Sequence, residues 1–394
     1  MIETTEERGK LTIRLAGRID STNAPDAEKE LMEIAAEHPG DEWIIAADDL
    51  EYISSAGLRV LMKLRKQAKK AVVIRNVAPS VYDILEMTGF TELFTVEKQL
   101  RQISVEGLPM IGKGANGEVY RLDEERIIKV YNPLTNTPDK IRREKNAARQ
   151  AFIHGIPSAI SYDIVKVGDR YGMIYEMIDA MTLGEAMARH PERLEEYAHR
   201  MAELLKTLHG TAFEPGVLPD ARDGLQVWAD VAEQSGCYSA DVIAKLRSLI
   251  RSIPPRDTFI HGDFHPGNIM VSGDEFILID MGDASVGDPI IDLLGAYQIM
   301  KLVPQRKGGS ERYTGVPGEQ MTRVWDIFIR DYTGITESEM LAAYENRLKF
   351  YSLIRTLAGI TFSELIPKET LGGLVKDVTN AFLTGYSIMQ GNPG

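Results

Sequence analysis

The most informative stretch of this chain is HGDFHPGN, residues 261–268, followed by FILIDMG, residues 276–282. Asp263 can accept the proton of a hydroxyl group, and Asn268 and Asp280 offer hard oxygen ligands of the kind that Mg²⁺ prefers. Phosphoryl transfer needs little else: a loop and a lysine over a nucleotide, with metal ions that neutralise the phosphates. These two segments therefore predict a phosphoryl-transfer site, with the loop and the lysine expected upstream.

A glycine-rich segment with the pattern G-x-G-x-x-G-x-V lies earlier, with its glycines at Gly112, Gly114 and Gly117. The same glycines occur in dinucleotide-binding folds, but there a helix follows the third glycine. Here residues 119–122 are β-prone, so we expect the loop at the tip of a hairpin. The next extended run alternates apolar residues around Lys129, which would pair the α/β-phosphates. Glu144, in a helical segment expected over 140–152, would hold Lys129 in place.

Taken in this order, the motifs resemble the protein-kinase-like superfamily over roughly residues 108–390. Gly262 stands where protein kinases usually have Arg, and residues 283–286 leave no room for a long activation segment. The loop 261–268 and the later run from Gly287 to Leu293 resemble aminoglycoside phosphotransferases and choline kinases. One departure is that the glycine-rich loop is fuller than that branch usually shows. The resemblance implies a bilobal fold, with a sheet-containing N-lobe over 108–178 and a largely helical C-lobe over 179–394.

The resemblance also assigns roles to individual residues. Asp263 is the expected catalytic base, Asn268 and Asp280 the expected Mg²⁺ ligands, and ATP the expected nucleotide. The run 171–178 resembles the inter-lobe hinge, so the backbone of Glu176 and Ile178 would meet adenine, with Tyr175 behind it. We expect His261 to bond the backbone around the loop and Asp292 to accept backbone N–H groups. Glu345 or Glu364 could receive a cationic acceptor.

The first hundred residues alternate strand and helix patterns, which predicts an α/β unit with a mainly parallel sheet. Strands are expected at 11–15, 43–47 and 71–74, and Pro25 and Pro79 are placed to open helices. A polar stretch at 97–108 marks the boundary, so we expect a first domain over 1–100. The chain is therefore expected to be a βα-sheet domain followed by a kinase-like α+β domain.

Residues 49–59, DLEYISSAGLR, resemble the strand-to-helix motif of the STAS domain of anti-sigma-factor antagonists. Ser55 matches the phosphoacceptor serine of that family, whereas Ser54 stands where the family often has Asp. A phosphate at this position would meet the positive end of a helix dipole. The alternative is that Ser55 is only the N-cap of the helix 57–69.

Composition narrows the possible partners and the compartment. The formal net charge of −13 argues against bulk nucleic-acid binding, and no run of 18 apolar residues suggests a membrane span. The single cysteine, Cys237, cannot form an intrachain disulfide, and we expect it to be a small buried residue. These features are typical of a reducing cytoplasm.

The sequence therefore favours an ATP- and Mg²⁺-dependent phosphotransferase acting on a small-molecule hydroxyl, preceded by a regulatory STAS domain that could bind a protein partner. One alternative is a regulatory serine/threonine kinase acting on a STAS-type protein or on its own Ser55. Another is a non-catalytic switch that only binds nucleotide. The short segment between Asp280 and Asp288 favours the first reading, because a protein acceptor normally needs a platform there.

Overall fold

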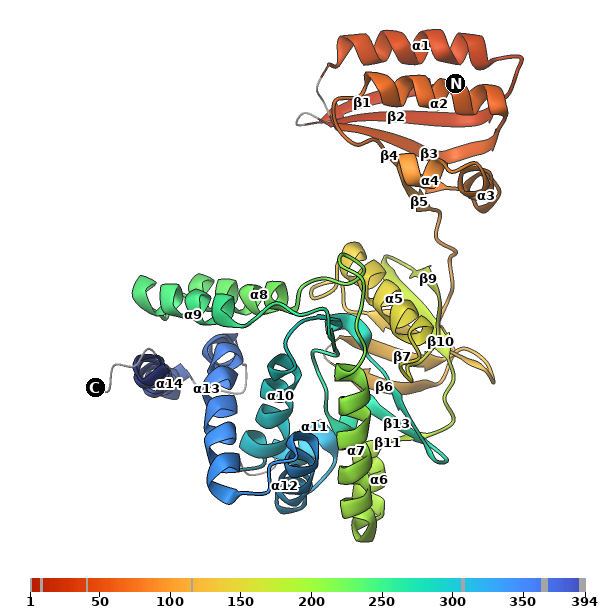
Figure 1. Cartoon of the computed structure of the whole chain (residues 1–394). Coiled ribbons are helices and arrows are strands. Elements are labelled where there is room, and N and C mark those ends of the chain that lie inside the picture. The colour runs from red at the N-terminus through yellow and green to blue at the C-terminus, as the bar shows by residue number, and fades with distance from the viewer. Residues whose placement is uncertain are drawn as a thin grey trace. The chain divides into compact units, whose positions relative to one another are not determined.

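A computed structural model describes residues 2–7, 10–39, 42–114, 116–305, 309–362 and 368–389 of the chain. The chain divides into two compact units, Met1–Ser104 and Val105–Gly394, called here the N-terminal and C-terminal units (Figure 1). Each unit has its own hydrophobic core, and each is described by itself.

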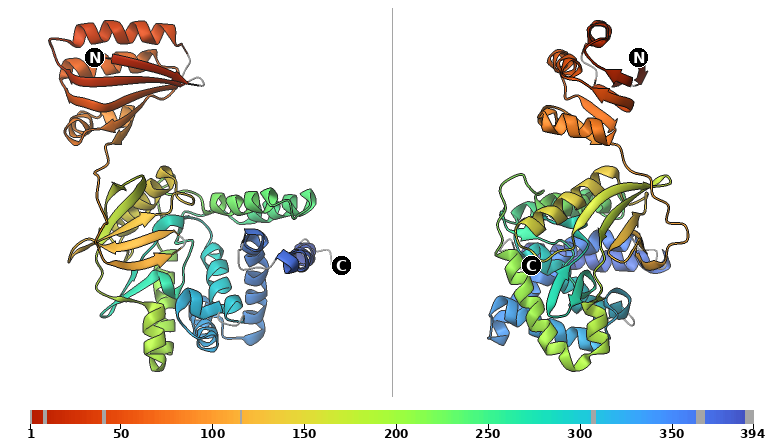
Figure 2. Two further views of the ribbon diagram at one scale, coloured as in Figure 1. Left: turned by 180° about the vertical axis from the view of Figure 1, so that it is seen from behind. Right: turned by 90° about the vertical axis from the view of Figure 1, so that its right-hand side faces the viewer.

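The N-terminal unit is a five-stranded sheet in the order β1-β2-β3-β4-β5 with helices packed against it (Figure 2). The elements are β1 (Ile2–Glu7), β2 (Lys10–Ile19), α1 (Ala24–Glu37), β3 (Glu42–Ile53), α2 (Ser55–Gln67), β4 (Val73–Val77), α3 (Pro79–Met87), α4 (Phe90–Leu93) and β5 (Thr95–Lys98). Strands β2 to β5 pair in parallel, as expected of a βα pattern, whereas β1 is antiparallel to β2. Alternate residues of β2, such as Ile13 and Leu15, pack on helical residues such as Leu61 and Leu64.

The C-terminal unit begins with an antiparallel sheet in the order β6-β7-β8-β10-β9, called here the sheet lobe. It comprises β6 (Met110–Gly114), β7 (Gly117–Arg121), β8 (Arg126–Tyr131), α5 (Pro138–Ile153), β9 (Ser161–Val167) and β10 (Arg170–Glu176). Helix α5 starts where Thr137 accepts a hydrogen bond from the amide of Lys140, with Pro138 in the first turn. The β6–β7 hairpin has the glycine-rich segment at its tip, as the sequence predicted.

The remainder is a largely helical lobe with two short antiparallel sheets, β11-β13-β14 and β12-β15 (Figures 1 and 2). Its elements are β11 (Met181–Thr182), α6 (Leu183–Arg189), α7 (Leu194–His209), α8 (Ala221–Gln234), α9 (Ala240–Ser252), β12 (Phe259–Ile260), β13 (Ile269–Ser272), β14 (Glu275–Leu278), β15 (Ser285–Val286), α10 (Ile290–Tyr297), α11 (Gly309–Thr314), α12 (Gly318–Thr333), α13 (Ser338–Phe362) and α14 (Lys368–Met389). Buried aromatic rings such as Phe264, Trp325 and Phe328 join the loop 261–268 to α12. The expected architecture, a βα sheet unit followed by a two-lobed α+β unit, is confirmed.

Two local features differ from the sequence expectation. Strand β1 was not predicted, because its residues are mostly acidic or polar and only its pairing with β2 makes it a strand. Cys237 is exposed rather than buried, because it lies in the turn between α8 and α9. Among the described residues, none of the helices is both long enough and apolar enough to span a membrane.

Candidate functional site

Lys129 lies at the centre of a buried ion-pair network. It projects from β8, and its Nζ lies 2.9 Å from Glu144 Oε1 on α5 and 2.9 Å from Asp280 Oδ1 in the helical lobe. The hydroxyl of Tyr175 on β10 donates to the same Glu144 oxygen over 2.7 Å. Glu144 is almost fully buried, so these two donors compensate its desolvated charge. Burial alone would lower the pKa of Lys129, but Asp280 and Glu144 outweigh burial and raise it.

The backbone of Asp280 adopts a conformation that residues other than glycine seldom adopt. It follows β14 with φ of +62°, in the left-handed region. Such strain is typical of functional positions, where the surrounding structure imposes it. Burial would raise the pKa of this carboxyl, but the charge and hydrogen bond of Lys129 outweigh burial and lower it. Asp280 is therefore ionised at neutral pH.

The hairpin of β13 and β14 brings Asp280 beside Asn268. The amide of Ile279, next to Asp280, donates to the carbonyl oxygen of Asn268 over 3.0 Å. The side-chain nitrogen of Asn268 donates to the backbone oxygen of Asp263 at 2.9 Å and to its Oδ2 at 3.1 Å. The amide oxygen of Asn268 is therefore the atom that can serve a metal ion. Three residues expected to act together, Asp263, Asn268 and Asp280, do lie together.

The carboxylate of Asp263 is flanked by cationic or protonated groups. The amide of Gly267 donates to Nδ1 of His265 over 3.0 Å, so the ring proton is on Nε2, which lies 3.5 Å from Asp263 Oδ2. Arg355 Nη2 lies 3.9 Å from Asp263 Oδ1. Burial would raise the pKa of Asp263, but His265 foremost, and then Arg355, hold it below its ordinary range. Asp263 is thus ionised at neutral pH and is suited to accept a hydrogen bond from a hydroxyl group.

Asp292 supports the loop from α10, as the sequence predicted. Its carboxylate is fully buried and accepts from the amide of His261 at 2.9 Å and from the amide of Gly262 at 2.6 Å. Gly262 has φ of +84°, and a Cβ there would lie 2.5 Å from the carbonyl oxygen of Asp283. The ring of His261 bonds the loop backbone, with Nδ1 accepting from the amide of Asp263 and Nε2 3.2 Å from the carbonyl oxygen of Ile279. A side chain at 262, as in protein kinases, would disturb this arrangement.

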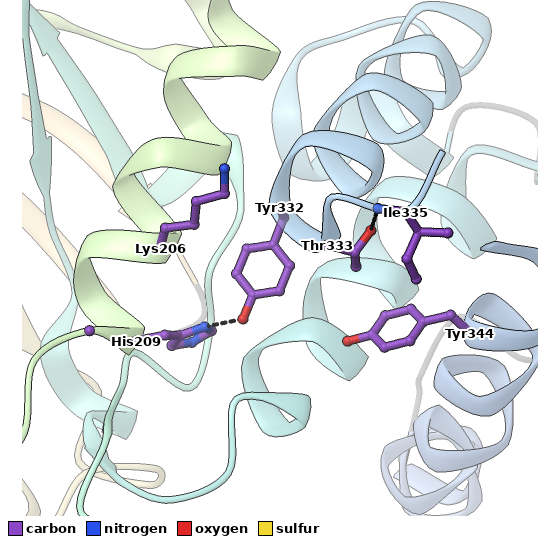
Figure 3. A pocket seen from close by; sticks show the side chains of 7 residues that line it. Lys206, His209, Tyr332, Thr333, Ile335 and Tyr344 are labelled. Carbon is purple, nitrogen blue, oxygen red and sulfur yellow. Dashed lines mark hydrogen bonds between the residues drawn. The ribbon is translucent and has the colours of Figure 1, made fainter. Parts of the chain in front are cut away.

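An open cavity of about 440 Å³ is lined in part by His209, which contacts Asp292 (Figure 3). Seven residues line it, among them Lys206, His209, Tyr332 and Tyr344, with Gly210, Thr333 and Ile335. Nδ1 of His209 lies 2.7 Å from the Tyr332 hydroxyl, and its Nε2 lies 3.1 Å from Asp292 Oδ2. Asp263 does not line this cavity, whereas His209 connects it to Asp292 and so to the loop.

The hinge residues take part in backbone contacts of the sheet lobe. The amide of Glu176 donates to the carbonyl oxygen of Ile160, and the amide of Met177 donates to that of Glu125. The carbonyl oxygen of Ile178 accepts from the amide of Ala180. These contacts use the amide of Glu176 and the carbonyl of Ile178.

The second and third glycines of the glycine-rich segment, Gly114 and Gly117, differ in what their positions require. Gly117 has φ of +154°, and a Cβ there would fall far inside contact distance of the Val130 carbonyl oxygen. A Cβ on Gly114 would have no atom within 4 Å. Only Gly117 therefore requires glycine for the folding of the hairpin, and a need for glycine at 114 would have to come from a bound molecule.

We therefore expect Gly117→Ala to lower the melting temperature of the C-terminal unit by several degrees, since backbone strain of this kind costs about 1–3 kcal/mol. Gly114→Ala is the matched control and should leave the melting temperature unchanged. Differential scanning calorimetry of both variants measures the effect. Equal melting temperatures for the two variants would contradict the close approach of Gly117 to Val130.

One expected acceptor residue is engaged elsewhere, one lies outside the described residues, and one residue of the site was missed. Glu345 accepts a hydrogen bond from Trp325 Nε1 at 2.5 Å, so its carboxylate serves the core of the helical lobe. Glu364 lies outside the described residues. Arg355, in contrast, was not predicted, because it belongs to an amphipathic helix distant in the sequence and carries no motif. Only the packing of α13 brings it to Asp263.

Comparison with known families agrees with this geometry. The model of the phosphotransferase enzyme family, APH, matches residues 108–325, which is more than half of the chain. The chain belongs to this family. The model of the STAS domain matches residues 1–103, so the N-terminal unit is a STAS domain. Both resemblances inferred from the motifs are thus confirmed.

Individual relatives cover different shares of the chain. A Bordetella bronchiseptica protein described as an anti-sigma factor antagonist is 37% identical over 93 residues, which are 22% of this chain and 78% of that protein. The GDP complex of an aminoglycoside 2′-phosphotransferase is 15% identical, and the alignment covers 78% of this chain and 98% of that one with a TM-score of 0.45. A choline/ethanolamine kinase family protein from Mesorhizobium loti is 16% identical, with 71% and 91% coverage and a TM-score of 0.44.

Proposed function

We propose that the C-terminal unit transfers the γ-phosphoryl group of ATP, with Mg²⁺, to a hydroxyl group of a small molecule. One observation carries the proposal: the Lys129–Glu144–Asp280 network and the Asp263–Asn268 pair converge from both lobes on one site. A non-catalytic fold would have no need to keep Asp263 ionised beside Arg355 and His265.

In this proposal the acceptor hydroxyl donates its hydrogen bond to a carboxylate oxygen of Asp263. The hydroxyl oxygen forms a bond to the γ-phosphorus while the bond from that phosphorus to the bridging oxygen breaks, and the electron pair leaves with ADP. The hydroxyl proton passes to Asp263. Lys129, held by Glu144, pairs the α/β-phosphates, and the backbone of Gly112, Gly114 and Gly117 covers them.

The donor set fits Mg²⁺. Within the described residues, no group of three or more His, Cys, Asp or Glu side chains is arranged to hold a metal. Asn268 and Asp280 would therefore supply two oxygen ligands and leave the remaining positions to phosphate and water, as is usual for this ion. When bound, the metal would neutralise phosphate charge. Glu176 and Ile178 would place adenine through backbone groups, against the ring of Tyr175.

Nucleotide binding is the direct test. Mg-ATP at millimolar concentration should raise the melting temperature of the C-terminal unit by mass action. Lys129→Ala should lose most of this shift, because the lysine is the cation that faces the phosphates. Lys245→Ala is a suitable control, since Lys245 pairs with Asp241 within α9. No stabilisation of the wild type by Mg-ATP would refute the proposal.

For the N-terminal unit we propose that Ser55 is a phosphoacceptor in a domain that binds a protein partner. The specific observation is that Ser54, not Ser55, is the N-cap of α2: Ser54 Oγ accepts from the amide of Gly57 over 3.4 Å. Ser55 is exposed in the first turn. Its hydroxyl is therefore not needed for capping, and added negative charge there would meet the positive end of the helix dipole. The similarity to an anti-sigma factor antagonist supports a protein partner.

We expect Ser55→Asp to leave the melting temperature of the N-terminal unit and the affinity for Mg-ATP unchanged. Ser54→Ala, the matched variant, should cost the N-terminal unit about 1 kcal/mol through the lost cap. Mass spectrometry after incubation of the full chain with Mg-ATP then decides whether Ser55 is an acceptor of its own C-terminal unit. An unmodified Ser55 in a chain that phosphorylates a small molecule would reject self-transfer.

A further inference from the structure

Arg355 lies beside the carboxylate of Asp263, although the sequence did not predict it as a site residue. It projects from α13, its side chain is only 16% exposed, and Nη2 lies 3.9 Å from Asp263 Oδ1. The guanidinium carbon lies 5.4 Å from the centre of the Trp228 ring on α8. Two helices of the helical lobe therefore hold one cation beside the carboxylate that would orient the acceptor.

The packing around this guanidinium depends on a glycine. A Cβ on Gly295, in α10, would lie 2.6 Å from Nη1 of Arg355 and 4.0 Å from the carbonyl oxygen of Gly262. Any larger residue at 295 would push the guanidinium away from the loop. Because Gly295 has no side chain, the guanidinium of Arg355 can lie beside Asp263. Its packing over the Trp228 ring restricts the conformations of the Arg355 side chain.

Arg355 does more than balance the charge of Asp263. At 3.9 Å the two groups attract each other but are too far apart for a hydrogen bond. Asp263 already accepts from Asn268 and lies beside His265. A guanidinium that is largely desolvated and not hydrogen-bonded to its nearest carboxylate is suited to bind a second anion through its fork of N–H groups.

We infer that the acceptor carries an anionic group, a carboxylate or a phosphate, only a few bonds from the hydroxyl that is phosphorylated. This inference rests on the proposed function and specifies its substrate class. While the hydroxyl donates to Asp263, the anionic group pairs with Arg355. A cationic acceptor would instead place its charge against a fixed guanidinium, which disfavours binding. Of the two acids considered for a cation, Glu345 accepts a hydrogen bond from Trp325, and Glu364 lies outside the described residues.

The test compares acceptors that share a small hydroxyl-bearing frame and differ in charge. Wild-type protein with Mg-ATP is offered glycerate, glycerol 3-phosphate, glycerol, choline or kanamycin, and transfer of labelled phosphate is measured. We expect transfer to glycerate or glycerol 3-phosphate, and the two arms separate a carboxylate from a phosphate. Transfer confined to glycerol, choline or kanamycin overturns the inference, and so does no transfer to any of the five by protein that binds Mg-ATP. Protein that fails to bind Mg-ATP refutes the proposed function instead.

Variants then separate acceptor binding from a general effect on Asp263. Arg355→Gln should raise KM for the anionic acceptor about tenfold to a hundredfold, as expected for a lost charged hydrogen bond. KM for ATP should not change, and Arg355→Lys should restore part of the affinity. Arg347→Gln, on the same helix with its guanidinium over Tyr351, is the control and should resemble wild type. An unchanged KM for the anionic acceptor in Arg355→Gln, with only kcat reduced, would show that Arg355 acts on Asp263 alone and overturn the inference.

Discussion

Replacing Asp263 with Asn is expected to lower kcat by roughly a thousandfold, because a positioned general base contributes about 10²–10⁴-fold. The Asn side chain has nearly the same shape but cannot take the proton of the acceptor hydroxyl. Folding should persist, since Asn268 can still donate to the backbone oxygen of residue 263, a contact independent of the side chain. Nucleotide affinity should also persist, because Lys129 and Asp280 are unchanged.

The measurement is single-turnover phosphoryl transfer, with the melting-temperature shift by Mg-ATP as a parallel check on binding. Asp274→Asn, in the exposed turn between β13 and β14, is the matched control and should retain full turnover. Wild-type kcat in Asp263→Asn would show that the base has been assigned to the wrong residue. A wild type that binds Mg-ATP but transfers nothing to any acceptor, water included, would favour the switch hypothesis.

The residues that could be predicted from the sequence share one property: their function fixes their local spacing. Asp263, Asn268 and Asp280 lie within one loop and one hairpin, so the order of residues along the chain carries their geometry. The glycine-rich segment was recognisable because backbone conformation restricts which residues can stand there. Lys129 and Glu144 were predictable only through the strand and helix on which they lie. The structure places their charged atoms 2.9 Å apart.

What could not be predicted depends on packing between distant helices. Arg355 and Trp228 come from α13 and α8, and nothing in their local sequence indicates that they meet beside Asp263. Gly295 looks like an ordinary small residue in a helix until the guanidinium beside it is known. The exposure of Cys237 likewise depends on where a turn falls. Long-range contacts of this kind leave no periodic signal in the sequence.

The second large effect is expected at Asp292. Asp292→Ala should lower the free energy of unfolding of the C-terminal unit by about 3 kcal/mol, because a buried donor left without its acceptor costs about 1–3 kcal/mol. Two backbone amides, those of His261 and Gly262, would lose their acceptor together. His209 would lose its partner as well, although it keeps the Tyr332 hydroxyl. The melting temperature should fall by roughly 5–10 °C.

Calorimetry of the full chain should show this loss in the transition of the C-terminal unit and leave that of the N-terminal unit in place, since each unit has its own core. Asp292→Asn keeps one carbonyl oxygen and should fall between wild type and Asp292→Ala. Combining Asp292→Ala with His209→Ala should cost less than the sum of the single losses, because the two side chains are in contact. Full additivity would show that His209 does not act through Asp292.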